Sequence, residues 1–306
     1  MQNTDMKGRI DMMKKLLFKG AATALVTPLN EKGVDFDALA KITETQIQNG
    51  IDALVVCGTT GEAPTLEDNE HLDAIECVVA TAKSRVPVIA GTGSNNTAHA
   101  IMMNKEAQKR GADGLLWVTP YYNKTTQRGL IKHYEALAAS TDLPAILYNV
   151  PGRTGVDIKA ETVEVLAKIE NIVAIKEATG DVARAVDIIS RCGDSIDIYS
   201  GNDDITVPLM SIGAKGVISV LSNIMPKETH EMCELCFKGD FSAASKLQVR
   251  YFPLIDALFS EVNPIPVKTA MNLMGMNAGI LRLPLYEMAD STLENLKAQM
   301  QRLNLI

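Results

Sequence analysis

Eight short apolar runs, each closed by glycine, threonine, asparagine or proline, restrict the fold of this sequence more than any other feature. They lie at residues 21–28, 53–62, 86–93, 114–123, 144–155, 172–180, 196–203 and 216–223. Helical periods separate the runs, as between Phe36 and Ile47, and Gly50 then supplies a stop. Eight strands that alternate with helices predict a (β/α)8 barrel, with an open doubly wound sheet as the alternative.

The open sheet is the weaker prediction because its glycine fingerprint is incomplete. The one candidate, Gly91 to Asn96, lacks the third glycine of a dinucleotide-binding turn. After residue 225 the strand pattern stops, and the segments that follow have helical patterns. We therefore expect a disordered extension over residues 1–16, a barrel over residues 17–225 and a C-terminal helical region over residues 226–306.

The composition excludes several classes of protein. Of 306 residues, 46% are hydrophobic and 22% are charged, which is the balance of an ordinary globular protein. The net charge of -7, without a Lys/Arg cluster, leaves no electrostatic footprint for nucleic acid. No apolar stretch is long enough for a membrane span or a signal peptide. The odd number of cysteines, 5, argues for a reducing cytoplasm rather than a disulfide framework.

A metal site is one interpretation of the spacing of His230, Cys233 and Cys236. On a helix, however, these side chains fan over roughly 120° and climb about 9 Å, whereas zinc needs every ligand within about 2.3 Å. The histidines of the chain show no HxxxH pairing either. We expect neither a metal nor a cofactor.

Lys176 is unusual because it ends an apolar strand, Ile172 to Ile175, of the kind that is buried on both faces. Polar residues follow most of the eight runs, at the face where barrel enzymes hold their chemistry. The lysine could clamp a phosphate or carboxylate, pair with Glu177, or act as a nucleophile. Desolvation disfavours the charged ammonium and frees the amine to attack a carbonyl, so we favour a Schiff-base lysine.

Tyr148, one strand earlier, is suited to move the protons that turn a carbinolamine into an imine. A phenol is a poor base on its own, so it needs a relay of hydroxyls, for which Thr59 and Tyr122 are available. The turn of residues 58–62 offers hydroxyls and backbone amides to a small carboxylate, and Arg153 can grip a second one in bidentate fashion. Each has a plainer alternative: a core tyrosine, an ordinary βα turn and a solvated arginine.

A series of motifs, in this order, resembles the family of 4-hydroxy-tetrahydrodipicolinate synthases (dihydrodipicolinate synthases) from about Leu17 onward. The motifs are GTTGE, TPYYN, LYNVPGRTG, IKEATG, SGND, GVISV and NPIPVK. The resemblance implies a cytoplasmic barrel lyase without a cofactor. Such an enzyme condenses pyruvate with L-aspartate 4-semialdehyde in the diaminopimelate pathway of lysine biosynthesis. The resemblance also implies a homotetramer built as a dimer of dimers.

The resemblance also implies roles for single residues. Lys176 would form the imine with pyruvate, and Tyr148 would donate and accept protons. The catalytic set that it implies is Lys176, Tyr148, Thr59 and Tyr122, the last of these from a neighbouring subunit. The substrate-binding set is Thr60, Ile218, Gly201 and Arg153, of which Arg153 would receive the carboxylate of the semialdehyde.

Two alternatives stay open. One is another pyruvate-dependent aldolase, such as an N-acetylneuraminate lyase, although those relatives generally lack an arginine at the position of Arg153. The other is a barrel that only binds a keto acid. An inactive homologue would be expected to lose Lys176 or Tyr148, and both are present.

Many members of this family are inhibited by L-lysine in a cleft near a dimer interface. The corresponding residues here are His71, Asn95, His99 and Tyr121. Sensitive members have a carboxylate at the position of His99 and often a histidine at that of Asp68. Since lysine binds as a cation, the loss of the anionic partner predicts weak inhibition or none.

Overall fold

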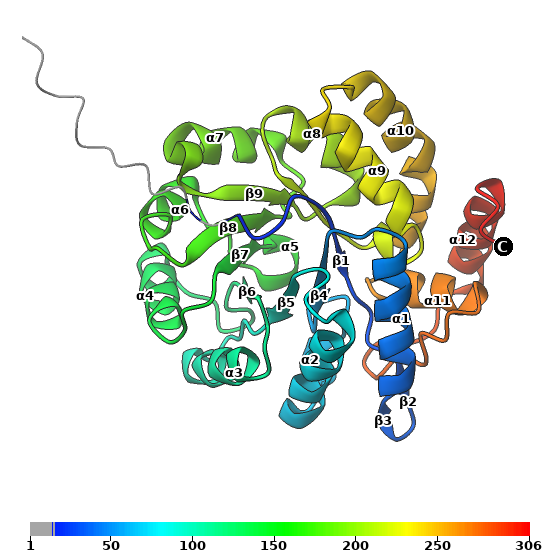
Figure 1. Ribbon diagram of the computed structural model, residues 1–306, viewed down its shortest axis with the longest axis horizontal. Helices are drawn as coiled ribbons and strands as arrows, with labels where there is room; N and C mark the ends of the chain where they lie inside the picture. Colours follow the sequence, from blue (N-terminus) through cyan, green and yellow to red (C-terminus); the bar gives the residue numbers. More distant parts are fainter. Residues whose placement is uncertain (1–13, 15) are drawn as a thin grey trace, which may run out of the picture.

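Eight parallel strands close into a barrel, in the order β1, β10, β9, β8, β7, β6, β5, β4 around the ring (Figure 1). They span Gly20–Ala24 (β1), Ala53–Val56 (β4), Val88–Gly91 (β5), Gly114–Val118 (β6), Ala145–Asn149 (β7), Ile172–Glu177 (β8), Asp197–Ser200 (β9) and Gly216–Ser219 (β10). This computed structural model describes residue 14 and residues 16–306. The extension expected over residues 1–16 therefore lies, but for two residues, outside the described part.

Each of the eight apolar runs overlaps one of these strands, so the predicted (β/α)8 barrel is confirmed and the open sheet is wrong. Helices follow the strands and surround the ring (Figure 1). They span Phe36–Gln48 (α1), Asp68–Ala82 (α2), Thr97–Lys109 (α3), Gln127–Ala138 (α4), Pro151–Thr154 (α5), Ala160–Leu166 (α6), Val182–Cys192 (α7), Thr206–Ser211 (α8) and Pro226–Phe237 (α9).

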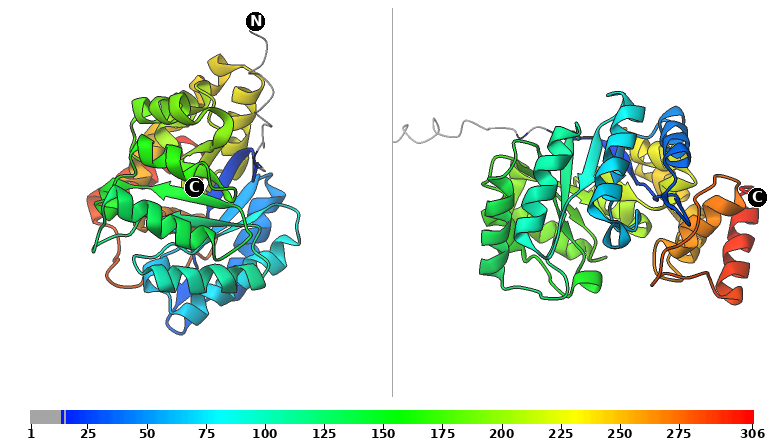
Figure 2. Two further views of the ribbon diagram at one scale, coloured as in Figure 1. Left: turned by 90° about the vertical axis from the view of Figure 1, so that its left-hand side faces the viewer. Right: turned by 90° about the horizontal axis from the view of Figure 1, so that it is seen from below.

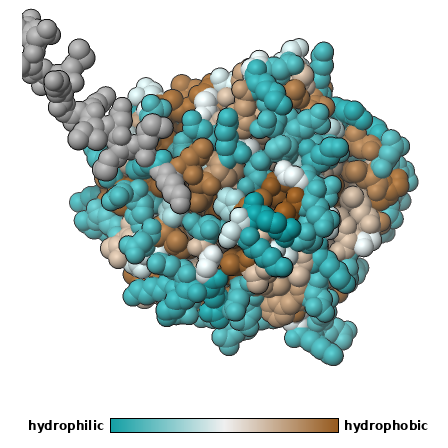
Figure 3. All heavy atoms as spheres, viewed as in Figure 1, coloured by the Kyte–Doolittle hydropathy of each residue, from teal (hydrophilic) through white to brown (hydrophobic). Residues whose placement is uncertain are grey.

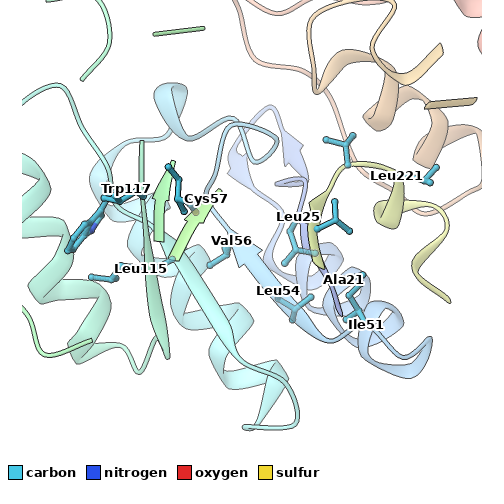
Figure 4. Close-up of a cluster of buried hydrophobic side chains, with 14 of the residues drawn as sticks. Ala21, Leu25, Ile51, Leu54, Val56, Cys57, Leu115, Trp117 and Leu221 are labelled. Atoms are coloured by element: carbon cyan, nitrogen blue, oxygen red, sulfur yellow. The ribbon is translucent and has the colours of Figure 1, made fainter. Parts of the chain in front are cut away.

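Side chains of the strands face two apolar layers, one inside the barrel and one outside it, which is why the runs are apolar throughout. In β4, Ala53 and Val55 belong to the cluster that fills the inside of the barrel. Leu54 and Val56 belong to the larger cluster between the barrel and its helices, part of which is drawn in Figure 4. The barrel interior is thus a packed core, and a site can open only at an end of the strands.

Two aromatic rings fill the inside of the barrel toward the amino ends of its strands. Phe18, which precedes β1, stacks on Tyr199 of β9 with ring centroids 4.1 Å apart. The Tyr199 hydroxyl donates a hydrogen bond of 2.5 Å to the carbonyl oxygen of Phe18. Both side chains are buried, so this end is filled and the opposite end is left for a ligand.

The chain is helical after β10, as expected. The last three helices span Phe241–Leu258 (α10), Ile265–Leu273 (α11) and Asp290–Arg302 (α12). Helix α9 packs on β1, α10 packs on α9, and α11 and α12 pack together at one edge of the molecule (Figure 2). The division into domains at residue 225 stays a prediction.

One small feature was not predicted: the hairpin of β2 (Leu29–Asn30) and β3 (Gly33–Val34). On the side seen in Figure 1 the surface is mostly hydrophilic, with apolar patches scattered between polar ones (Figure 3). Among the helices that the structure describes, none combines the length and apolar character that a membrane crossing requires.

Candidate active site

Lys176 and Tyr148 lie side by side on neighbouring strands. They are partners in the parallel register of β8 and β7, so their side chains leave the sheet on the same face, into the barrel. The Nζ atom of Lys176 lies 4.2 Å from the centre of the Tyr148 ring. Only 7% of Lys176 and 6% of Tyr148 is exposed, so the amine and the phenol ring lie together, largely shielded from solvent.

Glu177 does not form the ion pair that was an alternative role for Lys176. Its carboxylate accepts hydrogen bonds from the backbone N–H of Thr179, at 2.8 Å, and from Nδ2 of Asn149, at 3.1 Å. Successive residues of a strand point to opposite faces, which separates the two side chains. Burial raises the pKa of the Glu177 carboxyl.

Gly201, directly after β9, packs against the side chain of Lys176. Its N–H donates to the carbonyl oxygen of Glu177 at 2.7 Å. A Cβ atom at this position would lie 3.0 Å from Cε of Lys176 and 2.5 Å from Cβ of Ala178. The absence of a side chain at residue 201 therefore makes room for the lysine.

Asp203 places a buried carboxyl group near the lysine. One of its oxygens accepts hydrogen bonds from the N–H groups of Val220 and Leu221, at 2.9 and 3.0 Å. Burial raises the pKa of Asp203, while the ammonium of Lys176 acts in the opposite direction. Ile218, expected at the pyruvate site, lies buried in the same inner cluster as Tyr148.

The turn after β4 carries both predicted threonines. The N–H of Glu62 donates to the carbonyl oxygen of Thr59 at 3.1 Å and closes the turn. Thr59 lines a cavity together with Tyr148. The Thr60 hydroxyl is buried and accepts a hydrogen bond of 2.9 Å from Nδ2 of Asn263.

Arg153 reaches the same cavity from α5, whose first residue, Pro151, starts the helix without a donor to satisfy. Its Nη2 atom donates to the carbonyl oxygen of Asn263 at 3.3 Å. Asn263 thus contacts both Thr60 and Arg153. The sequence alone gave Asn263 no role, because nothing in its neighbourhood shows that a residue far along the chain returns to the barrel mouth.

The cavity encloses about 410 Å³ and extends from the barrel mouth to the starts of α2 and α3. Its active-site end is lined by Thr59, Tyr148 and Arg153. Its other end holds most of the residues expected in a lysine cleft: His71, His99 and Tyr121, together with Asp68. Residues of both predicted sites, although not Lys176 itself, therefore line one cavity.

An acid and an imidazole face each other in the cleft end. Nε2 of His99 lies 2.9 Å from Oδ1 of Asp68. Burial lowers the pKa of His71, whose Nε2 lies 2.7 Å from the carbonyl oxygen of Gly91. A neutral imidazole that donates to this carbonyl satisfies both observations. Asn95 lies outside the cavity lining and donates to the backbone of Tyr121 at 3.2 Å.

Tyr122 is the one predicted catalytic residue that lies apart from the others. Its side chain is 92% exposed, whereas those of Lys176 and Tyr148 are buried. Its backbone has a φ of 70°, in the left-handed region that tyrosine rarely adopts.

The spacing of His230, Cys233 and Cys236 does not form a metal site. Nδ1 of His230 lies 2.8 Å from the Asp52 carboxylate, and the two cysteines are buried and free. Within the described residues, no group of three or more His, Cys, Asp and Glu side chains could hold a metal ion.

A closed barrel with a buried lysine beside a tyrosine, at the carboxyl end of the strands, defines the class of (β/α)8-barrel lyases. Residues 17–303 match the dihydrodipicolinate synthetase family. The 4-hydroxy-tetrahydrodipicolinate synthase of Acetivibrio thermocellus is 51% identical over 294 residues, which are 96% of this chain and 100% of that protein. The chain belongs to the dihydrodipicolinate synthetase family, and its activity is that of a 4-hydroxy-tetrahydrodipicolinate synthase, a lyase of lysine biosynthesis.

Solved structures agree with this assignment. The dihydrodipicolinate synthase of Thermotoga maritima superposes with a TM-score of 0.93 at 40% identity, covering 95% of this chain and 100% of that one. The chloride-inhibited enzyme of Acinetobacter baumannii, solved in complex with pyruvate, superposes with a TM-score of 0.92 at 45% identity, covering 94% and 99%. The alternative of an N-acetylneuraminate lyase is thereby set aside.

Proposed function

We propose that Lys176 carries the reaction by forming an imine with the keto carbon of pyruvate, with loss of one water. A proton then leaves the methyl carbon and yields an enamine, whose carbon attacks the aldehyde of L-aspartate 4-semialdehyde. The amino group of that substrate next attacks the imine carbon and displaces the Lys176 amine. The product is a heterocycle, and the lysine returns to its starting state.

The observation that carries this proposal is the position of the lysine amine over the Tyr148 ring, inside the barrel and largely shielded from solvent. Imine formation needs a neutral amine and a group that gives and takes protons close to it. In the proposal Tyr148 is that group. Thr59, which lines the same cavity, and Tyr122 of a neighbouring subunit complete the relay.

The proposed substrate contacts divide between two parts of the site. Thr60 and the backbone near Ile218 hold the pyruvate carboxylate, with Gly201 as the wall behind the lysine. Arg153 receives the carboxylate of the semialdehyde, for which a guanidinium is the natural bidentate partner. No cofactor takes part, because the lysine amine itself activates the substrate.

We also propose a homotetramer, a dimer of dimers, in the cytoplasm. The exposed side chain and constrained backbone of Tyr122 support a second chain at the active site. The cysteines of the described residues are all free, as is usual for a protein of a reducing compartment. Sedimentation of the purified protein measures the oligomeric state.

Trapping with borohydride tests the mechanism. Pyruvate and borohydride should label Lys176 alone, because only an imine is reduced to a stable secondary amine, and peptide mass spectrometry locates the label. The variant Lys176→Arg keeps the charge and should take up no label and lose nearly all activity while it stays folded. A label on Lys268, or none in the native protein, would contradict the mechanism.

A further inference from the structure

Lys268 and Glu62 form an ion pair that is closed off from solvent. Lys268 lies in α11, in a helix that is otherwise largely apolar, and Glu62 ends the turn that follows β4. Their side chains are 1% and 0% exposed, and Nζ lies 2.6 Å from Oε1. The two residues are 206 positions apart in the sequence, so the contact joins the C-terminal helices to the barrel mouth.

Every charged atom of this pair has its hydrogen-bond partner. The Lys268 ammonium donates to the Glu62 carboxylate and to the carbonyl oxygens of Thr27, at 3.0 Å, and Ile280, at 2.5 Å. The second oxygen of Glu62 accepts from the N–H of Arg282 at 3.0 Å. A buried charge pair with all partners satisfied holds its atoms in one arrangement.

The arrangement fixes the turn that presents the two active-site threonines. Glu62 has a φ of 55°, and its N–H closes the turn onto the carbonyl oxygen of Thr59. Thr27, which accepts from Lys268, donates its own hydroxyl to the carbonyl oxygen of Gly61 at 2.7 Å. The turn is therefore held at two residues: at Glu62 by the ion pair with Lys268, and at Gly61 by the hydrogen bond from Thr27, which itself contacts Lys268.

We infer that the Lys268–Glu62 pair is a positioning device that sets the Thr59 and Thr60 hydroxyls for pyruvate capture and proton transfer. This inference rests on the proposed roles of those two threonines. The pair touches no substrate and acts only through the turn. Damage to it should therefore be felt mainly by pyruvate and by the proton transfers, and much less by the semialdehyde, because the turn reaches Arg153 only through Asn263.

The decisive variant is Glu62→Asp, which keeps the charge but shortens the side chain by one methylene. To keep its contact with Lys268 the carboxylate must draw the turn out of place, and otherwise the contact is lost. Its matched control is Glu70→Asp. Glu70 holds the guanidinium of Arg282 at 2.7 and 2.9 Å. The backbone N–H of Arg282 bonds Glu62, but among the described residues the Glu70 carboxylate makes no hydrogen bond to the turn itself. A third protein, Lys268→Met with Glu62→Gln, removes both charges together so that neither is left buried alone.

We expect Glu62→Asp and the double variant to raise the KM for pyruvate and to lower kcat, each by about tenfold or more. The KM for the semialdehyde should stay within about twofold of the native value. Borohydride labelling of Lys176 should slow in parallel, while Glu70→Asp keeps native kinetics. A shift of both KM values together, or a loss of thermal stability with native kinetics in the folded fraction, would make the pair merely structural and overturn the inference. Failure of the native protein to label at all would instead refute the proposed mechanism, so the two failures are distinct.

Discussion

Replacing Gly201 by alanine should disable the lysine without unfolding the protein. The added Cβ would lie 2.5 Å from Cβ of Ala178, a distance that carbon atoms essentially never show, and 3.0 Å from Cε of Lys176, which is tighter than an ordinary contact. The Ala178 methyl cannot rotate away, so the backbone or the lysine must move. Overpacking of this kind costs about 1 to 3 kcal/mol of unfolding free energy, which a domain of ordinary stability survives.

The effect on chemistry should be larger than the effect on stability. A displacement of about 1 Å at a reacting atom lowers a rate by roughly 100-fold, so trapping of pyruvate by borohydride on Lys176 should slow by about that factor. Urea unfolding gives the stability of the same preparation. Gly152→Ala is the control, since a Cβ there meets no atom within 4 Å. Labelling of Gly201→Ala at the native rate would show that the lysine does not depend on this space.

Four further predictions follow from the site and its surroundings. Arg153→Ala should raise the KM for the semialdehyde about 10- to 100-fold, and that for pyruvate much less, because a charge-assisted contact is worth about 1.5 to 3 kcal/mol. Equal effects in steady-state kinetics would make the arginine structural. Tyr122→Phe should lower kcat while the oligomer stays intact, and native turnover would exclude it from the relay. L-lysine should inhibit weakly or not at all at concentrations below about a millimolar, which corresponds to roughly 4 kcal/mol of binding free energy. The reason is that the Asp68 carboxylate, which could bind the lysine cation, already faces His99 at 2.9 Å. Initial rates at saturating pyruvate, measured across lysine concentrations, decide this. Burial lowers the pKa of His133 from 6.5 to about 4. As the pH falls from 6.5 to 4, this histidine is therefore protonated in the unfolded chain but still neutral in the folded protein, and the free energy of unfolding should fall by up to about 3 kcal/mol. Urea titrations of His133→Gln should lack this part of the slope.

The strands and most helices could be predicted because each is specified by its own residues. Apolar runs ended by turn residues mark strands wherever they occur, and the break at Asn49 and Gly50 ends α1 at Gln48 as expected. The hairpin of β2 and β3 could not be predicted, since each strand has two residues and leaves no period to detect.

The site could be predicted only in part, for a similar reason. Lys176 is recognisable because a lysine after four apolar residues is out of place locally. Lys268, which follows Ile265, Pro266 and Val267, is out of place in the same way, and this signal could have identified it. Asn263 carries no such signal, because its contacts with the barrel mouth exist only once the chain has folded.

Closure of the ring by β1 and β10 has a consequence for synthesis on the ribosome. Gly20 pairs with Gly216, so one edge of β1 has no partner strand until the ribosome has made residue 216 of 306. During that time the growing sheet has two open edges, which are the usual starting point of association between chains. The partner of Glu62 is made later still, at Lys268. The closed ring and the ion pair can therefore form only late in translation, and we expect chains released before residue 216 to require a chaperone or to aggregate.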